Sequence, residues 1–119
     1  MLAEARAGLA RLPPAEARDA LANGGLVIDI RSEFQQDRDG TIDRARHVPR
    51  NVLEWRLDPA CLHRDDSLAR RGERIILICD EGYQSSLAAA TLCRFGLNAT
   101  DVIGGFQAWR KAGLPVQSA

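Results

Sequence analysis

The stretch from Ile75 to Ser86 constrains the fold of this chain more than any other part of it. Four consecutive apolar residues, Ile75 to Ile78, lead into Cys79, and a polar turn containing Gly82 then leads into an alanine-rich segment. This order predicts a strand, a tight loop and a helix. A strand that is apolar at consecutive positions is typical of a buried parallel sheet. Cys79 would then lie at the carboxyl end of that strand, where open α/β sheets place their ligand sites.

Strands and helices are expected to alternate along the rest of the chain. Further strands are predicted at residues 9–12, 26–30, 47–49 and 98–103, each rich in apolar or β-branched residues or followed by a helix-forming segment. The expected helices are residues 13–23, 51–57, 65–71, 84–95 and 105–112. Such alternation predicts a mostly parallel sheet with helices on both faces and right-handed crossovers.

Three local patterns give more specific expectations. Glu33 and Phe34 are expected to form one helical turn, and the polar segment 35–40 has the composition of an exposed loop. Asn51 is followed three positions later by Glu54, a variant of the capping box that opens helices. Residues 1–8 are alanine-rich but too few to hold a helix without a packing partner.

Composition excludes several classes of protein. A chain of 119 residues forms one domain with a single core. Sixteen basic side chains balance sixteen acidic ones, so nothing favours a nucleic-acid partner. No apolar run approaches the eighteen residues needed to span a membrane, and Glu4 interrupts any signal core at the N-terminus. We therefore expect a reduced, cytoplasmic protein without nucleic-acid or membrane partners.

The cysteines and histidines do not suggest a metal or a disulfide framework. Three cysteines at irregular spacing cannot form a complete set of disulfides, and Cys61-x-His63 matches no standard zinc pattern. Cys61 and Cys93 are expected to be structural, and no metal or cofactor is expected. Asp29 and Arg31 are expected to pair with each other or with backbone near the sheet edge.

Several stretches, taken in order, point to one family. They are Asp29-Ile30-Arg31, Gly40-Thr41-Ile42 with Ala45 and Val48-Pro49, Cys79 to Ser85, and Gly104-Gly105-Phe106-Gln107-Ala108-Trp109 with Gly113-Leu114-Pro115-Val116. Each piece alone is a weak signal, but the ordered set, with a cysteine at a strand end, is specific. From about residue 9 to the C-terminus the chain resembles a single-domain rhodanese.

The resemblance implies a three-layer α/β/α fold with a five-stranded, mostly parallel sheet. Residues 9–119 would form the domain and residues 1–8 an N-terminal extension. It also implies a sulfurtransferase, in which the cysteine thiolate takes sulfane sulfur from a donor such as thiosulfate, becomes a persulfide and passes the outer sulfur to a nucleophile. Covalent catalysis of this kind divides one transfer into two easier steps.

In this reading Cys79 is the catalytic residue, and the rest of the Cys79 loop (residues 79–85) binds the substrate. The substrate-binding residues would be Asp80, Glu81, Gly82, Tyr83, Gln84 and Ser85. The implied partners are a small sulfane-sulfur donor or a protein persulfide, and a thiol, cyanide or protein acceptor. The protein would act as a monomer.

The loop must stabilise a thiolate, because an unperturbed cysteine with a pKa of about 8.5 is only slightly ionised at pH 7. A shift of two pKa units requires about 2.7 kcal/mol, whereas a helix N-terminus supplies about 0.3–1 kcal/mol and roughly 2 at best. Hydrogen bonds from loop N–H groups must supply the remainder. Gly82 is the residue expected to let the backbone approach the sulfur.

The chain departs from the family at several positions. Asp80 and Glu81 stand in a loop that often carries basic residues, and Gln84 is neutral. Each acid would oppose a thiolate about 4 Å away by about 1 kcal/mol in a water-like dielectric. A protein-borne or neutral persulfide donor is therefore more compatible than thiosulfate. Thr41, Asp43 and Arg44 replace the usual histidine, proline and glycine, a change expected to affect the local turn.

The residues of the Cys79 loop also bear on two other functional classes. Cysteine phosphatases include relatives of this fold, but their loop needs an arginine that closes on phosphate. Here Gln84, Ser85 and Ser86 occupy the available positions, and Ile78 replaces the usual histidine, so this class is disfavoured. The alternative is a non-catalytic binding or regulatory rhodanese module, or a sulfur-relay subunit for a biosynthetic enzyme. Arg31, Arg46, Arg50 and Arg56 could rim the pocket, although the sequence does not place them.

Overall fold

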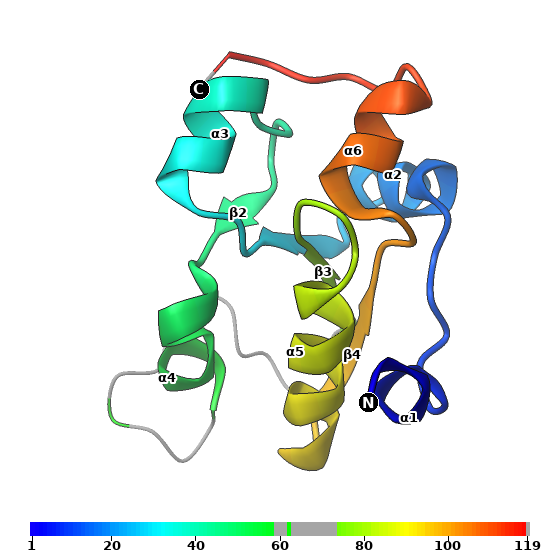
Figure 1. The fold of residues 1–119 in the computed structure, drawn as a ribbon, viewed down its shortest axis with the longest axis vertical. Helices are drawn as coiled ribbons and strands as arrows, with labels where there is room; N and C mark the ends of the chain where they lie inside the picture. Colours follow the sequence, from blue (N-terminus) through cyan, green and yellow to red (C-terminus); the bar gives the residue numbers. More distant parts are fainter. Residues whose placement is uncertain (59–61, 63–73, 119) are drawn as a thin grey trace.

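A parallel sheet forms the centre of the molecule. The computed structural model describes residues 1–58, 62 and 74–118. The strand order is β2-β1-β3-β4, and the strands are β1 (Leu26–Asp29), β2 (Arg46–His47), β3 (Arg74–Ile78) and β4 (Asn98–Asp101) (Figure 1). Every neighbouring pair is parallel. The carboxyl ends of all these strands therefore face the same edge, where Cys79 follows β3.

The sheet has four strands in the part of the chain that the structure describes, so the prediction of five is wrong. The predicted strand at residues 9–12 is reduced to one parallel bridge between Leu12 and Val102. The N–H of Leu12 donates to the carbonyl of Asp101, and its own carbonyl accepts from Ile103. Pro13 has no N–H to continue this ladder, and the chain turns at once into α2 (Pro14–Ala22).

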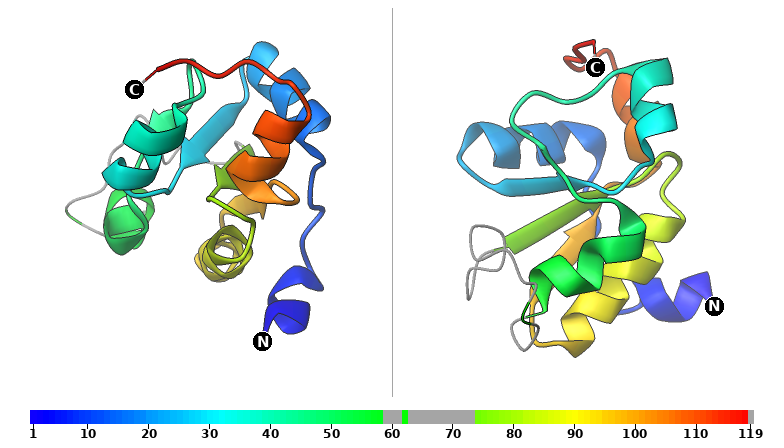
Figure 2. Two further views of the ribbon diagram at one scale, coloured as in Figure 1. Left: turned by 45° about the horizontal axis from the view of Figure 1, so that its top comes forward. Right: turned by 90° about the vertical axis from the view of Figure 1, so that its left-hand side faces the viewer.

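The core lies on both faces of the sheet, as the sequence predicts for a three-layer fold. Alternate residues of β3 face opposite ways. Ile75 and Leu77 pack toward α4 (Leu53–Leu57) and α5 (Gln84–Arg94). Ile76 and Ile78 pack toward α2 and α6 (Gly105–Lys111). Figure 2 shows α2 and α6 on one side of the sheet and α4 and α5 on the other. Burying each of these side chains contributes about 1.5–3 kcal/mol, which fixes the strand that carries Cys79.

Residues 33–39 form the helix α3 (Glu33–Asp39), so the prediction of a loop over 35–40 is wrong. A complete capping box opens this helix. Ser32 Oγ accepts from the N–H of Gln35, and the Gln35 side chain accepts from the N–H of Ser32. This box satisfies two backbone donors. The segment therefore forms a helix in spite of its loop-like composition.

The helix predicted to start at Asn51 begins differently. Asn51 lies inside a short 3₁₀ helix, η1 (Arg50–Val52), and α4 starts at Leu53 without a side-chain cap. The expected capping box of Asn51 and Glu54 is therefore wrong, because Glu54 instead pairs with Arg50 one turn earlier. The predicted helix over 65–71, together with Cys61 and His63, lies outside the described residues.

The turn before β2 contains Arg44, one of the residues that differ from the family pattern. Arg44 has a φ of 71°, in the left-handed region where glycine is usual and other residues are strained. Arg44 therefore occupies a backbone angle that favours glycine, and the effect of the substitution on the local turn stays a prediction.

The N-terminal residues form a short helix, α1 (Leu2–Arg6), which packs beside α5 (Figure 2). This contact supplies the packing partner that so short a helix needs. Among the residues that the structure describes, no helix is both long and apolar enough to cross a membrane.

Candidate active site

Cys79 lies on the floor of an open cleft at the carboxyl edge of the sheet. Its side chain is buried, with 5% of the residue exposed, because it continues the face of β3 that packs against α5. The cleft has a volume of about 520 Å³. Its walls are formed by the segment between β1 and α3, by α3, by the region of η1 and by the Cys79 loop. The lining residues are Ile30, Arg31, Ser32, Gln35, Pro49, Arg50, Asn51, Cys79, Asp80, Glu81, Tyr83 and Gln84.

The sulfur of Cys79 accepts hydrogen bonds from the loop backbone. The N–H of Gly82 lies 3.1 Å from Sγ and the N–H of Ser85 lies 3.4 Å from it. Gly82 has a φ of 91°, and a Cβ at this position would lie 3.0 Å from the backbone nitrogen of Gly104. Glycine is therefore required here both for its backbone angle and for space. These contacts form the N–H cradle that the sequence predicts around the sulfur.

Ser85 connects Cys79 to a buried carboxylate, Asp101 at the end of β4. Ser85 Oγ lies 2.7 Å from Asp101 Oδ2 and 3.3 Å from Cys79 Sγ. Because the hydroxyl has one proton and a carboxylate only accepts, Ser85 donates to Asp101 and accepts from the thiol. Ser86 Oγ also lies 2.8 Å from Asp101 Oδ2. Asp101 is fully buried, so these donors offset its desolvation.

Two arginines reach this network from the N-terminal segment. Arg11 forms an ion pair with Asp101, with its Nε 2.7 Å from Oδ1. Arg6 Nη2 donates to the carbonyl of Gly82 over 2.9 Å. Sequence reasoning missed Arg6, Arg11 and Asp101. Asp101 alone carried a signal, since it is an acidic residue within a predicted buried strand that ends at the ligand-binding edge.

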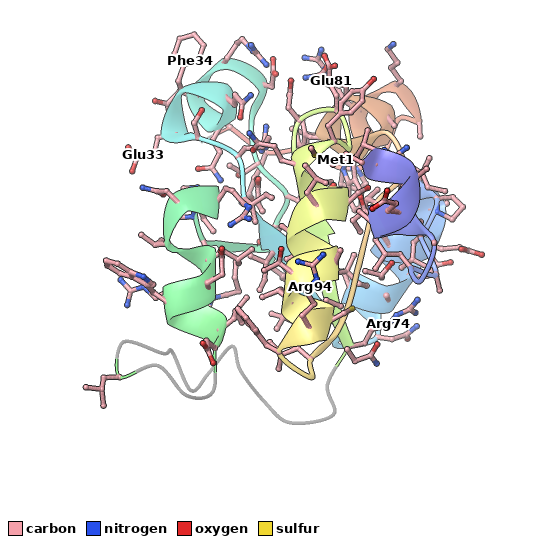
Figure 3. All side chains as sticks on the ribbon, turned by 60° about the horizontal axis from the view of Figure 1, so that its bottom comes forward. Met1, Glu33, Phe34, Arg74, Glu81 and Arg94 are labelled. Atoms are coloured by element: carbon pink, nitrogen blue, oxygen red, sulfur yellow. The ribbon has the colours of Figure 1, made fainter. Side chains whose placement is uncertain are left out.

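The two acids of the loop differ in their surroundings. The Asp80 carboxylate accepts from Gln107 Nε2 over 2.9 Å and lies 3.5 Å from Arg38 Nη2. These partners belong to α6 and α3, so this carboxylate is tied to those two helices. Glu81 is exposed at the surface of the molecule (Figure 3). Pairing of Asp80 and solvation of Glu81 both reduce the opposition of these acids to a thiolate.

Asp39 ties the same network to α3. Arg38 donates to Asp39 Oδ2 over 2.6 Å, and Gln107 Nε2 donates to it over 2.9 Å. The hydrogen bond from Arg38 holds the pKa of Asp39 below its usual value, with Gln107 contributing in the same direction. Gln107 therefore bridges Asp39 and Asp80 with its two amide protons.

The arginines in the cleft wall are already paired. Arg31 forms a buried ion pair with Asp29, with Nη2 2.7 Å from Oδ2, and its guanidinium lies over the Phe106 ring. The predicted pairing of Asp29 with Arg31 is confirmed. Arg50 forms an ion pair with Glu54. Of the arginines considered as rim residues, Arg31 and Arg50 line the cleft.

The predicted site residues divide into two groups. Cys79, Asp80, Glu81, Tyr83 and Gln84 line the cleft. Gly82 and Ser85 are buried behind the sulfur and contact Cys79 rather than the cleft. Ser85 is thus placed to hold the sulfur, and its assignment as a substrate-binding residue stays a prediction.

Cys93 is an exposed free thiol near the end of α5. Its Sγ donates to the carbonyl of Ala99 over 3.3 Å. Among the described residues no group of three histidine, cysteine or acidic side chains is placed to hold a metal ion.

Comparison with known proteins identifies the family. The chain is 29% identical over 105 residues to thiosulfate sulfurtransferase 16, chloroplastic, from Arabidopsis thaliana, covering 86% of this chain and 88% of that protein. It is 33% identical over 110 residues to thiosulfate sulfurtransferase GlpE from Ectopseudomonas mendocina, covering 92% and 91%.

A similar solved structure is that of a protein of unknown function, described as a possible tyrosine phosphatase, from Rhodopseudomonas palustris CGA009. The TM-score is 0.90 at 31% identity, over 98% of this chain and 90% of that one. A family model described as the rhodanese-like domain matches residues 13–112. The chain therefore belongs to the rhodanese-like domain family.

Proposed function

We propose that this chain is a sulfurtransferase in which Cys79 carries the transferred sulfur as a persulfide. The Cys79 thiolate attacks the sulfane sulfur of the donor, a new S–S bond forms, and the donor leaves with the electron pair of the broken bond. An acceptor nucleophile then attacks the outer sulfur, and the S–S bond to Cys79 breaks to return the thiolate. The observation that carries this proposal is the sulfur of Cys79, which accepts two backbone N–H bonds at the floor of an open cleft.

The surroundings of the sulfur support a thiolate and a bound persulfide. Backbone donors to a charged acceptor are roughly twice as strong as neutral hydrogen bonds. When the thiol loses its proton, the Ser85 hydroxyl can turn its proton to the sulfur, because Asp101 keeps Arg11 and Ser86 as partners. The same donors can then hold either sulfur of the persulfide.

The charges of the cleft favour a neutral or protein-borne persulfide donor over thiosulfate. Arg31 and Arg50 are each paired with a carboxylate, so they offer little excess positive charge to a small dianion. Glu81 adds a negative charge at the mouth of the cleft. Turnover is expected with a persulfidated protein or small persulfide, and slower turnover with thiosulfate. We further propose that the protein acts as a monomer, with a thiol, cyanide or protein as the acceptor.

Intact-protein mass spectrometry tests the carrier role. The protein is incubated in turn with thiosulfate, mercaptopyruvate and a persulfidated cysteine desulfurase. The expected result is a gain of one sulfur atom that maps to Cys79 and is lost on addition of cyanide as thiocyanate. Cys79→Ser should abolish both, whereas Cys93→Ser, which removes an exposed thiol, should change neither. Failure of all three donors to leave a sulfur on Cys79 would contradict the proposal.

The same experiment separates the alternatives. Loading by the desulfurase alone, with slow release to cyanide, would indicate a sulfur-relay subunit. Absence of loading together with specific binding of a partner would indicate a non-catalytic module. The resemblance to a possible tyrosine phosphatase makes hydrolysis of p-nitrophenyl phosphate a useful control. We expect no hydrolysis, because the positions that could supply the phosphatase arginine hold Gln84, Ser85 and Ser86.

A further inference from the structure

The N-terminal segment reaches the candidate active site although it precedes the region matched by the family model, residues 13–112. Arg6, at the end of α1, makes two hydrogen bonds to the Cys79 loop and α5. Its Nη2 donates to the carbonyl of Gly82 over 2.9 Å, and its Nε donates to Ser86 Oγ over 3.0 Å. α1 lies beside α5, which follows the loop (Figure 3). One guanidinium thus joins the N-terminal helix to the loop.

Arg11, in the segment between α1 and α2, also contacts this loop. Its Nε and Nη2 lie 2.7 Å and 3.2 Å from the two carboxylate oxygens of Asp101, a bidentate pair. Its Nη2 also lies 3.5 Å from the carbonyl of Gly82. Asp101 in turn accepts from the hydroxyls of Ser85 and Ser86. Arg6 and Arg11 therefore hold both ends of the segment Gly82–Ser86.

These contacts act on the two groups that donate to the sulfur. Arg6 donates to the carbonyl of Gly82, and the N–H of Gly82 donates to Cys79 Sγ. Gly82 lies in the left-handed region, and glycine has many other backbone conformations of similar energy. Anchoring its carbonyl restricts this freedom. The cationic side chains also offset the charge of Asp101, which would otherwise oppose a thiolate nearby.

We propose that Arg6 and Arg11 are positioning residues of the sulfur-transfer site, and that residues 1–12 are a working part of it rather than an extension. They keep the N–H groups of Gly82 and Ser85 directed at the sulfur of Cys79. This inference rests on the proposed function for its effect on activity, but the restraint on the loop is a property of the protein in any case.

The test compares Arg6→Gln with Arg6→Lys and with Arg94→Gln, which removes an exposed arginine near the end of α5. Hydrogen exchange of peptides covering residues 80–86 measures the restraint without any sulfur donor. Loss of charge-assisted hydrogen bonds should speed exchange in this segment by roughly tenfold in Arg6→Gln. Exchange in α2 and β1 should not change, and Arg94→Gln should match the wild type throughout.

The rate of sulfur loading onto Cys79 measures the consequence. Arg6→Gln should lower the rate at saturating donor by roughly tenfold. The donor concentration at half-maximal rate should not change, because Arg6 does not line the cleft. Arg6→Lys keeps the charge but not the forked geometry, so it should recover only part of the rate. If Arg6 had a purely structural role, Arg6→Gln would lower the stability of the protein without lowering the rate at saturating donor while the half-maximal donor concentration stays unchanged.

The outcomes separate the two proposals. If the wild type loads no sulfur but Arg6→Gln speeds exchange at 80–86, the proposed function fails and the restraint on the loop stands. If the wild type loads sulfur and Arg6→Gln matches Arg94→Gln in both exchange and loading, the inference is overturned. If Arg6→Gln lowers the melting temperature enough to obscure these measurements, the same two measurements on Arg6→Lys test the inference. Exchange and loading rates in Arg6→Lys that equal those of the wild type would overturn the inference.

Discussion

At the scale of single residues, the orientation of Asp80 affects how well this loop can hold a thiolate. The sequence places two acids directly after Cys79, and each would oppose a thiolate if it faced the sulfur. Gln107 Nε2 holds the Asp80 carboxylate on the side of α3 and α6. The glutamine sits in the stretch Gly104 to Trp109, a part of the resemblance to which the sequence assigned no role. Its role follows only from the packing of α6 beside the loop.

Gln107→Ala should therefore slow sulfur loading onto Cys79. Without Gln107 the Asp80 carboxylate keeps only the longer contact with Arg38 and can rotate toward the sulfur. An opposing interaction of about 1 kcal/mol corresponds to roughly a fivefold loss in rate. Stopped-flow measurement of loading with a small persulfide would show this. The double variant Gln107→Ala/Asp80→Asn is the control, since removing the charge should restore the rate. A double variant as slow as Gln107→Ala would contradict this role.

The sequence predicted the residues that touch the sulfur but not those that hold them. Cys79 and Gly82 could be found because a strand end and a tight turn leave local signals. Arg6 and Arg11 could not, because their contacts with Gly82 and Asp101 join positions about seventy to ninety residues apart. Such contacts depend on the packing of α1 against α5. No local pattern distinguishes these arginines from solvated ones.

At the scale of elements, side-chain capping determines whether a short polar segment forms a helix, which its composition does not predict. The polar segment after Ser32 has a loop-like composition, yet it forms α3 because Ser32 and Gln35 satisfy each other's backbone donors. The predicted cap at Asn51 is wrong, because Glu54 forms an ion pair with Arg50 instead. The long apolar strand β3 and the helix after it were predicted well, since their signal spans many residues. Short elements depend on one or two side chains.

Ser32→Ala should destabilise the protein by about 1 kcal/mol, the usual effect of removing an N-cap side chain. The loss leaves the N–H of Gln35 without its partner. Urea unfolding, with an unchanged m-value, would measure it. Asp37→Ala removes an exposed side chain of the same helix and should change stability by less than about 0.5 kcal/mol. Equal effects of the two variants would show that the capping box does not stabilise α3.

At the scale of the whole molecule, charge pairs connect elements that the sheet itself does not join. Asp39 accepts from Arg38 within α3 and from Gln107 and Arg110 on α6. Gln107 passes this connection on to Asp80 in the Cys79 loop. The position of the loop acid therefore depends on the contact between α3 and α6. A change in the ionisation of Asp39 should therefore alter both the free energy of unfolding and the position of Asp80 in the Cys79 loop.

The pH dependence of unfolding tests this connection. The folded protein holds the pKa of Asp39 below its usual value, mainly through the hydrogen bond from Arg38. An unfolded aspartate titrates near a pKa of about 3.9, so the folded state binds the proton less readily. The stability from this group is therefore fully present above about pH 5 and is lost as the pH falls through the depressed folded pKa.

Asp39→Asn should accordingly be less stable than the wild type near pH 7, with a difference that shrinks as the pH falls below about 4. Urea unfolding at a series of pH values measures it, and Asp19→Asn, at an exposed position of α2, is the matched control. A stability difference that stays constant down to the lowest pH would show that the ionisation of Asp39 does not hold α3, α6 and the loop together.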